Sequence, residues 1–333
     1  MKIRSIVSGM ALLCSATFAF AQPAPIIIKF SHVTAVDTPK GAAAEYFKKL
    51  VDERSKGRVR IEVYPNSQLY KDKEELEALQ MGAVQMLAPS LSKFGPLGVK
   101  EFEVFELPYL FEDTQSVHKL TRAPIGQQLL KKLEPKGIVG LAYWDNGMRQ
   151  MTANRPLHAV SDWKGQKFRI VSAKVTDAYT RAMGAMPQVM AFSEIYQAMQ
   201  SGVVDGGENA LSNIYTQKFY EVQKHLTISN HGYLGYAVVI NKKFWDSLPP
   251  DIRTLLEGAL ADATKYNDDI ADKDNQRALE AIRKSGKTTI YTLTPEEKAA
   301  WKKQMLPVHQ QVESRIGKEL IQSVYKEIGF KAD

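Results

Sequence analysis

Cysteine is almost absent from the sequence, which has one such residue, Cys14, among 333. Cys14 lies in an amino-terminal segment that we expect to be removed, so the mature chain has no thiol, disulfide or thiolate metal ligand. Disulfides are common in exported proteins, but a chain of this length buries enough apolar surface to fold without them. Histidine is also sparse, and the six histidines show no H-x-x-x-H or H-E-x-x-H spacing. The sequence therefore predicts no metal site and no other cofactor.

Catalytic and phosphate-binding motifs are missing as well. The sequence has no G-x-S-x-G, no P-loop and no G-x-G-x-x-G. Lys and Arg total 44 against 37 Asp and Glu, a formal net charge of +7, but the two signs alternate along the chain. No basic run or RNA-binding aromatic motif accompanies this charge. The sequence gives no reason to expect an enzyme or nucleic-acid binding, and a mild positive field favours small anions.

Long apolar runs are confined to the start of the chain. Lys2 and Arg4 precede a mostly apolar stretch, residues 6–20, and Ala19-Phe20-Ala21 has the small-residue spacing of a cleavage site. This is the pattern of a secretory signal peptide, and the stretch is short for a membrane span. We expect residues 1–21 to be removed on export, with a retained anchor or a lipoprotein as the less favoured alternatives.

The rest of the chain alternates between strand and helix patterns. Strand patterns cover residues 26–30, 58–64, 84–88, 137–143, 167–171 and 188–191. Helical patterns begin at Pro39, Asp72, Val175 and Ser193 and end near Gly57, Met81, Met183 and Gln200. This alternation is typical of parallel α/β sheets. Its restart near residue 137, in a chain long enough for about two domains, predicts two lobes.

Residues 250–285 form the most distinctive segment. After Pro250 it has no proline and one glycine, Gly258, and its apolar residues recur at helical spacing. A helix of about 35 residues is roughly 52 Å long, which exceeds one small lobe, so we expect it to run along both. A last helical pattern over residues 295–316 should be interrupted at Pro307 and pack on the outside.

Residues 144–236 are rich in groups that suit an anion. Arg149 follows a predicted strand and a glycine turn, Arg169 lies in a predicted strand, and Phe192 and Asn209 flank the next helical pattern. Arginine binds a carboxylate through two parallel N–H bonds, and asparagine adds a donor and an acceptor. Nearby Asp and Glu side chains could instead pair with both arginines in structural salt bridges. The residue types alone leave both interpretations open.

Several long stretches carry a resemblance to a known family. They are FSHV at 30–33 with DTPKG at 37–41, YPNSQLYKDKEEL at 64–76, LAPSLSKFGPLG at 87–98, QVMAFSE at 188–194 and NHGYLGY at 230–236. In these stretches the sequence resembles the periplasmic solute-binding proteins of TRAP (tripartite ATP-independent periplasmic) transporters, and within them the DctP type that binds C4-dicarboxylates. The likeness extends from Phe30 to Gly317.

The resemblance implies a two-lobed α/β fold, the periplasmic binding protein fold, with hinge strands and a long helix spanning both lobes. Lobe I would comprise residues 22–146 plus 235–274, and lobe II residues 147–234 plus 275–333. The signature arginine that holds the ligand carboxylate falls on Arg169.

The same resemblance places further binding positions. The second cationic position falls on Arg149, the family asparagine on Asn209 and the aromatic lining position on Phe192. A proline that is common after the asparagine is replaced here by Ala210, which leaves Asn209 in place. Dicarboxylate binders also use lobe I and the hinge, where the candidates are His32, Lys40, Ser90, Ser92 and Tyr236. For the first four of these, a structural role is as well supported as ligand contact.

The implied function is that of a monomeric periplasmic protein that captures malate, succinate or fumarate and delivers it to a sodium-coupled TRAP permease. No cofactor, metal, nucleic acid or catalysis enters this hypothesis. The alternatives are the same scaffold with another acid (a uronate, an aromatic 2-oxo acid or another 2-hydroxy acid), a periplasmic enzyme that acts on carboxylates, and a sensor partner of a histidine kinase.

Overall fold

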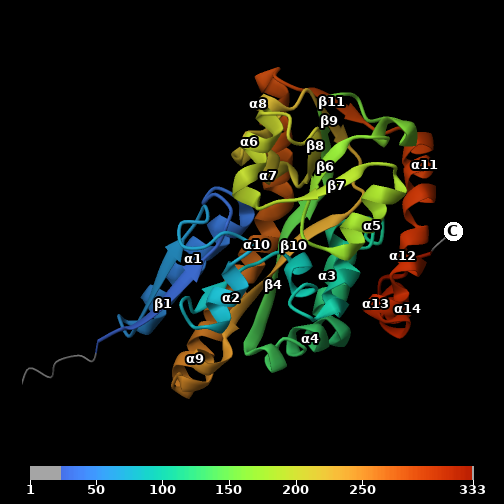
Figure 1. The fold of residues 1–333 in the computed structure, drawn as a ribbon. Coiled ribbons are helices and arrows are strands. Elements are labelled where there is room, and N and C mark those ends of the chain that lie inside the picture. Colours follow the sequence, from blue (N-terminus) through green and yellow to red (C-terminus); the bar gives the residue numbers. More distant parts are fainter. Residues whose placement is uncertain (1–23, 332–333) are drawn as a thin grey trace, which may run out of the picture.

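A computed structural model describes residues 24–331, which are built around two β-sheets (Figure 1). Sheet A has the strand order β2-β1-β3-β10-β4, and sheet B has the order β11-β9-β5-β8-β6-β7. The strands of sheet A are β1 (Ile26–Ser31), β2 (Val59–Tyr64), β3 (Met86–Leu87), β4 (Ile138–Met148) and β10 (Tyr233–Asn241). Those of sheet B are β5 (Gln150–Ala153), β6 (Lys167–Ile170), β7 (Met186–Val189), β8 (Gly206–Asn209), β9 (His225–Ile228) and β11 (Thr289–Thr292). We call the half built on sheet A lobe I and the half built on sheet B lobe II. The predicted signal peptide, residues 1–21, lies outside the described residues.

Helices cover both sheets. They are α1 (Pro39–Ser55), α2 (Glu75–Gln80), α3 (Thr114–Arg122), α4 (Pro124–Lys131), α5 (Lys174–Ala182), α6 (Ile195–Gln200), α7 (Leu211–Thr216), α8 (Phe219–Val222), α9 (Lys242–Ser247), α10 (Pro250–Ser285), α11 (Pro295–Met305), α12 (Pro307–Gln311), α13 (Glu313–Ile316) and α14 (Lys318–Ile328). Short 3-10 turns include η1 (Leu91–Phe94), η2 (Lys100–Glu106) and η5 (Phe192–Glu194). The long helix has the predicted bounds, and a new helix begins at Pro307 as expected. Among residues 24–331, no helix has the length and apolar character needed to cross a membrane.

Both sheets are mixed: the strands linked by helices pair in parallel, as their alternation predicts, and further strands are added antiparallel. In sheet A, β1 pairs in parallel with β2 and β3, but β10 is antiparallel to both β3 and β4. In sheet B, β5 is antiparallel to β8 and β9. The antiparallel strands β5 and β10 belong to the connections between the lobes. Their direction is set by the tertiary topology, which local sequence patterns do not specify.

Strand β4 is longer than predicted, because it continues through Gly147 to Met148. Gly147 lies within the strand, with a φ of 142° that residues with a side chain rarely adopt, and does not form the turn expected before Arg149. A Cβ atom at Gly147 would lie 2.6 Å from the Asn275 side chain of α10, so glycine lets the strand and the helix approach closely. Arg149 alone separates β4 from β5, so the strand path passes almost directly from sheet A to sheet B.

Two other helix starts differ from the prediction. Ser193 does not cap the following helix, since α6 begins at Ile195 after the 3-10 turn η5. The Glu194 carboxylate instead accepts a hydrogen bond from the Ala191 N–H at 3.2 Å. Helix α2 begins at Glu75, and Asp72 therefore lies in the loop between β2 and α2.

Three connections join the lobes. They are the passage from β4 to β5, the passage from β9 to β10, and α10, which packs against α1 and β4 in lobe I and against α7 in lobe II. Figure 1 shows α10 (orange) running along both lobes, as predicted. Asn275 ties this helix to both lobes, because its side chain donates to the Asn146 carbonyl at 2.5 Å and accepts from the Ser212 N–H at 3.0 Å.

The C-terminal helices α11–α14 lie on the outside of the molecule, along one edge of Figure 1. Trp301 of α11 is fully buried, and its indole donates to the His158 carbonyl at 2.8 Å. Arg315 of α13 forms a two-point ion pair with the buried Glu103, at 2.6 and 2.7 Å. These helices therefore contact elements of both lobes.

Candidate ligand-binding site

A small cavity lies between the two sheets. Its volume is about 40 Å³, counted as the space that the centre of a water molecule can occupy. This is a few times the roughly 10–15 Å³ that one water needs. Its walls are formed by Val33, Thr34, Asp72, Glu75, Ser90, Lys93, Arg149, Arg169, Val171, Phe192, Asn209, Asn213, Leu234 and Tyr236. Phe192 forms an apolar part of the wall and packs edge-on against Phe219, with 6.2 Å between the ring centroids.

Arg169 projects from β6 and is 2% exposed. Its Nε and Nη2 both donate to the Met190 carbonyl, at 3.2 and 3.0 Å. The nearest carboxylate oxygen belongs to Asp72 and lies 4.0 Å from Nη2. Burial lowers the pKa of Arg169 to about 10, although the Asp72 charge opposes this shift. Within the described residues, Nη1 has no hydrogen-bond partner. Arg169 is thus a buried cation with one end available to an anion.

Arg149 has a different environment, in which all three of its nitrogens are paired. Nε donates to the Tyr233 carbonyl at 2.9 Å, Nη1 to Glu208 at 2.8 Å and Nη2 to Glu106 at 2.8 Å. Burial by itself lowers the pKa of Arg149, but the charges of Glu106 and Glu208 outweigh it and raise the pKa. The same network lowers the pKa of Glu208 to about 2, against the effect of burial, because Arg149 and His231 both bind it. Arg149 therefore contributes to the cavity wall while serving as the centre of a buried salt-bridge network.

Two asparagines one helical turn apart place amide groups at the cavity. Asn209 ends β8, and its Oδ1 accepts from the Ala210 N–H at 3.0 Å and from Asn213 Nδ2 at 2.8 Å. The Asn209 Nδ2 group has no partner among the described residues. Asn213 Nδ2 also lies 3.5 Å from the Tyr236 hydroxyl, and its buried Oδ1 lacks a partner in the described structure. Both amides retain hydrogen-bonding capacity for a ligand.

Lobe I supplies a second cation to the cavity wall. Lys93 of η1 is 9% exposed, and its Nζ donates to Asp72 at 2.7 Å. Ser90 precedes η1, and its hydroxyl is hydrogen-bonded to that of Ser92. Glu75, at the first turn of α2, is fully enclosed, and burial raises its pKa to about 7 despite the opposing charges of Lys40 and Lys93. The lobe I wall therefore combines the Lys93 ammonium group, the carboxyl groups of Asp72 and Glu75, and the Ser90 hydroxyl.

Lys40 and His32 lie behind this wall, outside the set of lining residues. The Lys40 ammonium donates to the Ala88 carbonyl at 3.1 Å and lies 3.8 Å from the centre of the Tyr236 ring. Burial lowers its pKa to about 8, although the charge of Glu75 opposes the shift. Burial also lowers the pKa of His32 to about 3, and the charge of Lys40 adds to the effect. Lys40 therefore packs against the Tyr236 side of the site.

The structure brings together six of the nine predicted site residues, namely Arg149, Arg169, Phe192, Asn209, Tyr236 and Ser90. His32, Lys40 and Ser92 are buried next to this group but do not line the cavity. Ligand contact by any of the nine remains a prediction.

Sequence reasoning missed five polar residues of the wall, namely Asn213, Thr34, Asp72, Glu75 and Lys93. The spacing of Asn213, four residues after Asn209, is the one signal that pointed to it, since such residues meet across a helical turn. Asp72, Glu75 and Lys93 lie in the stretches that carry the family resemblance. Their contacts join residues far apart in the sequence, which local patterns do not encode.

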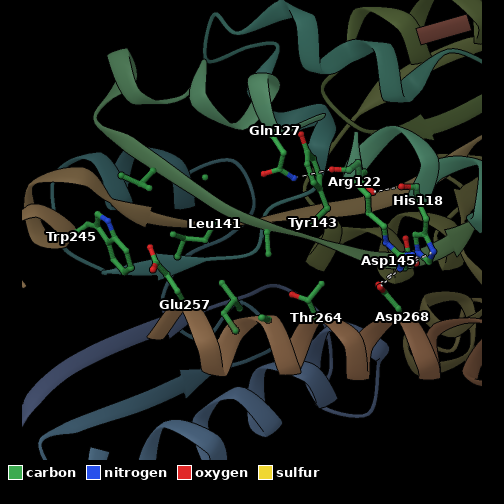
Figure 2. Close-up of a pocket in the computed structure, with 16 residues that line it drawn as sticks. His118, Arg122, Gln127, Leu141, Tyr143, Asp145, Trp245, Glu257, Thr264 and Asp268 are labelled. Atoms are coloured by element: carbon green, nitrogen blue, oxygen red, sulfur yellow. Dashed lines mark hydrogen bonds and ion pairs between the residues drawn. The ribbon is translucent and has the colours of Figure 1, made fainter. Parts of the chain in front are cut away.

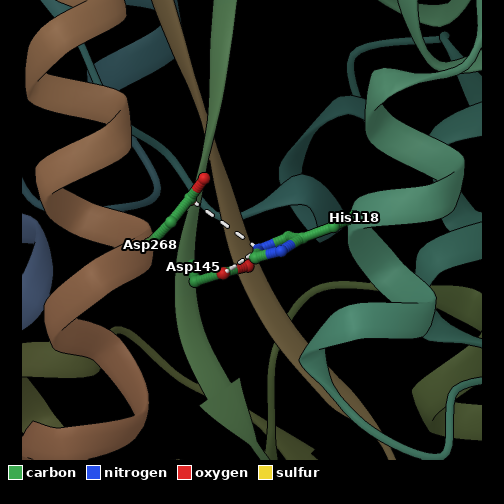
Figure 3. A group of neighbouring side chains, drawn as sticks. All are labelled: His118, Asp145 and Asp268. Carbon is green, nitrogen blue, oxygen red and sulfur yellow. Dashed lines mark hydrogen bonds and ion pairs between the residues drawn. The ribbon is translucent and has the colours of Figure 1, made fainter.

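A second, larger pocket of about 540 Å³ lies between β4 and α10 (Figure 2). Figure 2 places Trp245 at one end and a cluster of His118, Asp145 and Asp268 at the other. These three residues come from α3, β4 and α10, and their ligand-type atoms lie within 4.8 Å of one another (Figure 3). His118 Nε2 lies 2.5 Å from Asp145, and Arg122 pairs with Asp268 at 2.9 Å. The cluster thus balances its charges internally, with one arginine and one histidine facing two carboxylates.

Two α/β lobes that enclose a small cavity with cationic side chains define a protein of the solute-binding class. The chain belongs to the DctP family, bacterial extracellular solute-binding protein, family 7, whose family model matches residues 30–315. It is 57% identical to the C4-dicarboxylate-binding periplasmic protein DctP of Rhodobacter capsulatus, over 97% of this chain and 98% of that protein.

Solved structures of TRAP periplasmic solute-binding proteins have the same fold. One from Shewanella oneidensis with bound succinate is 44% identical, with a TM-score of 0.90 over 92% of this chain and 100% of that chain. Another, from Pseudomonas aeruginosa with bound L-malate, is 42% identical, with a TM-score of 0.84 over 86% of this chain and 100% of that chain. The predicted family and the two-lobed α/β fold are confirmed.

Proposed function

We propose that this protein captures a C4-dicarboxylate such as malate, succinate or fumarate between its lobes. The observation that carries the proposal is the pair of buried cations, one from each lobe, that line one small cavity. Within residues 24–331, Nη1 of Arg169 in lobe II has no hydrogen-bond partner, and Lys93 of lobe I donates to Asp72 at 2.7 Å. A guanidinium holds a carboxylate in a fixed plane, and an ammonium from the other lobe can meet the second carboxylate.

The size of the cavity favours a short acid. A space of about 40 Å³ for water centres suits a four-carbon chain better than the larger rings of a uronate or an aromatic 2-oxo acid. The names of the relatives above support the same choice, because they refer to C4-dicarboxylates, succinate and L-malate. A uronate, an aromatic 2-oxo acid or another 2-hydroxy acid is therefore the less favoured ligand.

The proposal includes the place and partners of the protein. It works in the periplasm as a monomer after removal of residues 1–21, and it hands the ligand to a sodium-coupled TRAP permease without catalysing a reaction. Lobe I comprises residues 22–146 plus 235–274, and lobe II residues 147–234 plus 275–333. The family resemblance supports this division, and the two sheets agree with it apart from residues 147–148 and 233–234, which are strand ends of sheet A.

Titration calorimetry with succinate, malate and butyrate tests the ligand class. We expect both dicarboxylates to bind much more tightly than butyrate, which lacks the second carboxylate. A ligand at a hundredfold excess over Kd should also stabilise the protein by about 2.7 kcal/mol in a thermal-shift assay. Equal affinity for butyrate would contradict the proposed role of two opposed cations.

Small-angle scattering tests the expected closure of the lobes. Saturating ligand should reduce the radius of gyration, because hinge closure is the usual way for two lobes to bury a small ligand. An unchanged profile, with binding established separately, would argue against a hinge mechanism.

A further inference from the structure

Two consecutive residues of lobe I reach across the cleft to the turn that forms the apolar wall of the cavity. Lys71 pairs with Glu194 at 3.1 Å, and Asp72 Oδ1 accepts a hydrogen bond from the Phe192 N–H at 3.1 Å. Lys71 and Asp72 precede α2 in lobe I, while Phe192 and Glu194 follow β7 in lobe II. We call these four residues the interlobe clasp.

The inner contact of the clasp is buried and charged, whereas the outer one is exposed. Asp72 is 7% exposed, and its Oδ2 accepts from Lys93 at 2.7 Å. Burial by itself raises the pKa of Asp72, but the charges of Lys93 and Arg169 and the Phe192 N–H outweigh it and lower the pKa. Asp72 is therefore ionised at neutral pH. The side chains of Lys71 and Glu194 are about half exposed, and such surface pairs contribute little.

Asp72 is also linked to Arg169 through one short segment of lobe II. Arg169 donates two hydrogen bonds to the Met190 carbonyl, and Asp72 binds the backbone of Phe192 two residues later. Both oxygens of Asp72 are thus occupied by Phe192 and Lys93. At 4.0 Å the carboxylate is too far from Nη2 of Arg169 for a hydrogen bond, and the Nη1 end stays free for a ligand.

We propose that Asp72 is a positioning residue that holds the lobes closed over the bound acid and fixes segment 190–192 beside Arg169. This inference rests on the proposed function, since it assigns a role in retaining that ligand. The opposite reading is that Asp72 competes with the ligand carboxylate for Arg169. The two readings predict opposite signs, because removing a closing contact speeds ligand release, while removing a competitor slows it.

Stopped-flow binding of succinate to Asp72→Ala and Asp72→Asn separates these readings. Losing a hydrogen bond to a charged group changes an equilibrium constant by roughly 10- to 150-fold. We expect Asp72→Ala to raise the dissociation rate constant by about that factor and to change the association rate constant less than about threefold, since the clasp forms after the ligand enters. Asp72→Asn should fall between, because its amide oxygen can still accept from Phe192.

Lys71→Ala is the matched control, since it removes the exposed contact of the same clasp. We expect it to change the dissociation rate constant less than about fivefold. Slower release from Asp72→Ala, or release from both Asp72 variants within twofold of Lys71→Ala, would overturn the proposal.

Hydrogen exchange of residues 190–194 in saturating succinate provides a second readout. The Phe192 amide should exchange slowly in the succinate-bound wild type and faster in succinate-bound Asp72→Ala, with the rest of lobe II unchanged. A wild-type protein that binds no dicarboxylate would contradict the proposed function, whereas intact succinate binding without this loss of protection would contradict the clasp alone. An amide equally protected in both proteins would refute it.

Discussion

Asn267 of the long helix α10 binds both backbone groups of Asp145 in the hinge strand β4. Its Oδ1 accepts from the Asp145 N–H at 2.6 Å, and its Nδ2 donates to the Asp145 carbonyl at 3.2 Å. Strand β4 is at the edge of sheet A, so it has no neighbouring strand on this side. One fully buried side chain therefore supplies the pairing that a sixth strand would otherwise provide. This contact joins the helix to the strand at the point where both pass between the lobes.

Replacing Asn267 with alanine should destabilise the protein. The Asp145 N–H and carbonyl would lose their partner in a buried position, and each unsatisfied group costs about 1–3 kcal/mol. Urea unfolding should therefore show a loss of at least about 1 kcal/mol in the free energy of unfolding. The control is Asp269→Ala, an exposed change on the same helix that should alter it by less than about 0.5 kcal/mol. Equal stability of the two variants would contradict the role of Asn267.

Replacing Arg169 with alanine should abolish tight binding and leave the ligand-free protein almost unchanged in stability. Truncating one partner of a buried charged pair costs about 2–5 kcal/mol, or roughly 30- to 4,000-fold in Kd. Among residues 24–331 the hydrogen bonds of Arg169 go to one carbonyl oxygen, so we expect the melting temperature measured without ligand to stay close to that of the wild type. Arg169→Lys should recover part of the affinity, since it restores the charge without the planar fork. Dicarboxylate affinity within about threefold of wild type, a difference of roughly 0.7 kcal/mol, would show that Arg169 is not the carboxylate clamp.

Replacing Arg149 should mainly lower the stability of the protein, whereas replacing Arg169 should mainly lower its affinity for the ligand. Arg149→Ala leaves Glu106 and Glu208 buried without their shared cation. Breaking a buried ion pair in this way costs about 3–5 kcal/mol, so a large fall in the free energy of unfolding is expected before any ligand is added. Arg181→Ala is the control for both arginine variants, because Arg181 is exposed and pairs only with Asp177 one turn away. A ligand-free Arg149→Ala protein as stable as the control would contradict the network.

The features that sequence patterns predicted correctly are those specified by neighbouring residues. The bounds of α10 follow from the helical spacing of apolar residues between Pro250 and the glycine after Ser285. The helix break at Pro307 follows because proline has no backbone N–H to donate within a helix. The opposed roles of Arg149 and Arg169 were not readable, because both are arginines near a strand end. What separates them is the presence of Glu106, 43 residues from Arg149, and no local pattern encodes that pairing.

The contacts across the cleft were missed for the same reason. Asp72 was placed at the start of a helix, yet its partners Lys93 and Phe192 lie 21 and 120 residues away. Family resemblance supplied the position of Arg169, since it carries tertiary information that composition and periodicity lack. The resemblance did not show that Arg149, unlike Arg169, has two buried carboxylate partners at hydrogen-bond distance.

The cluster of His118, Asp145 and Asp268 at the hinge should make stability depend on pH (Figure 3). The hydrogen bond from His118 to Asp145 raises the pKa of His118 above 6.5, and the charges of Asp145 and Asp268 add to this, while burial and Arg122 oppose it. A histidine with a raised pKa contributes stability that is fully present below its unfolded pKa and is lost as pH rises through the folded pKa.

Urea unfolding of the wild type and His118→Gln across the range from about pH 6 to about pH 9 tests this dependence. The difference in unfolding free energy between the two proteins should be largest at the acidic end and shrink as pH rises. His225→Gln is a control of opposite sign, because burial and the charges of His158 and Lys224 lower the pKa of His225. Its contribution is lost as pH falls, so the wild type should lose stability relative to His225→Gln at the acidic end. A difference between wild type and His118→Gln that stays constant or grows with pH would mean that the histidine does not carry a proton between the two carboxylates.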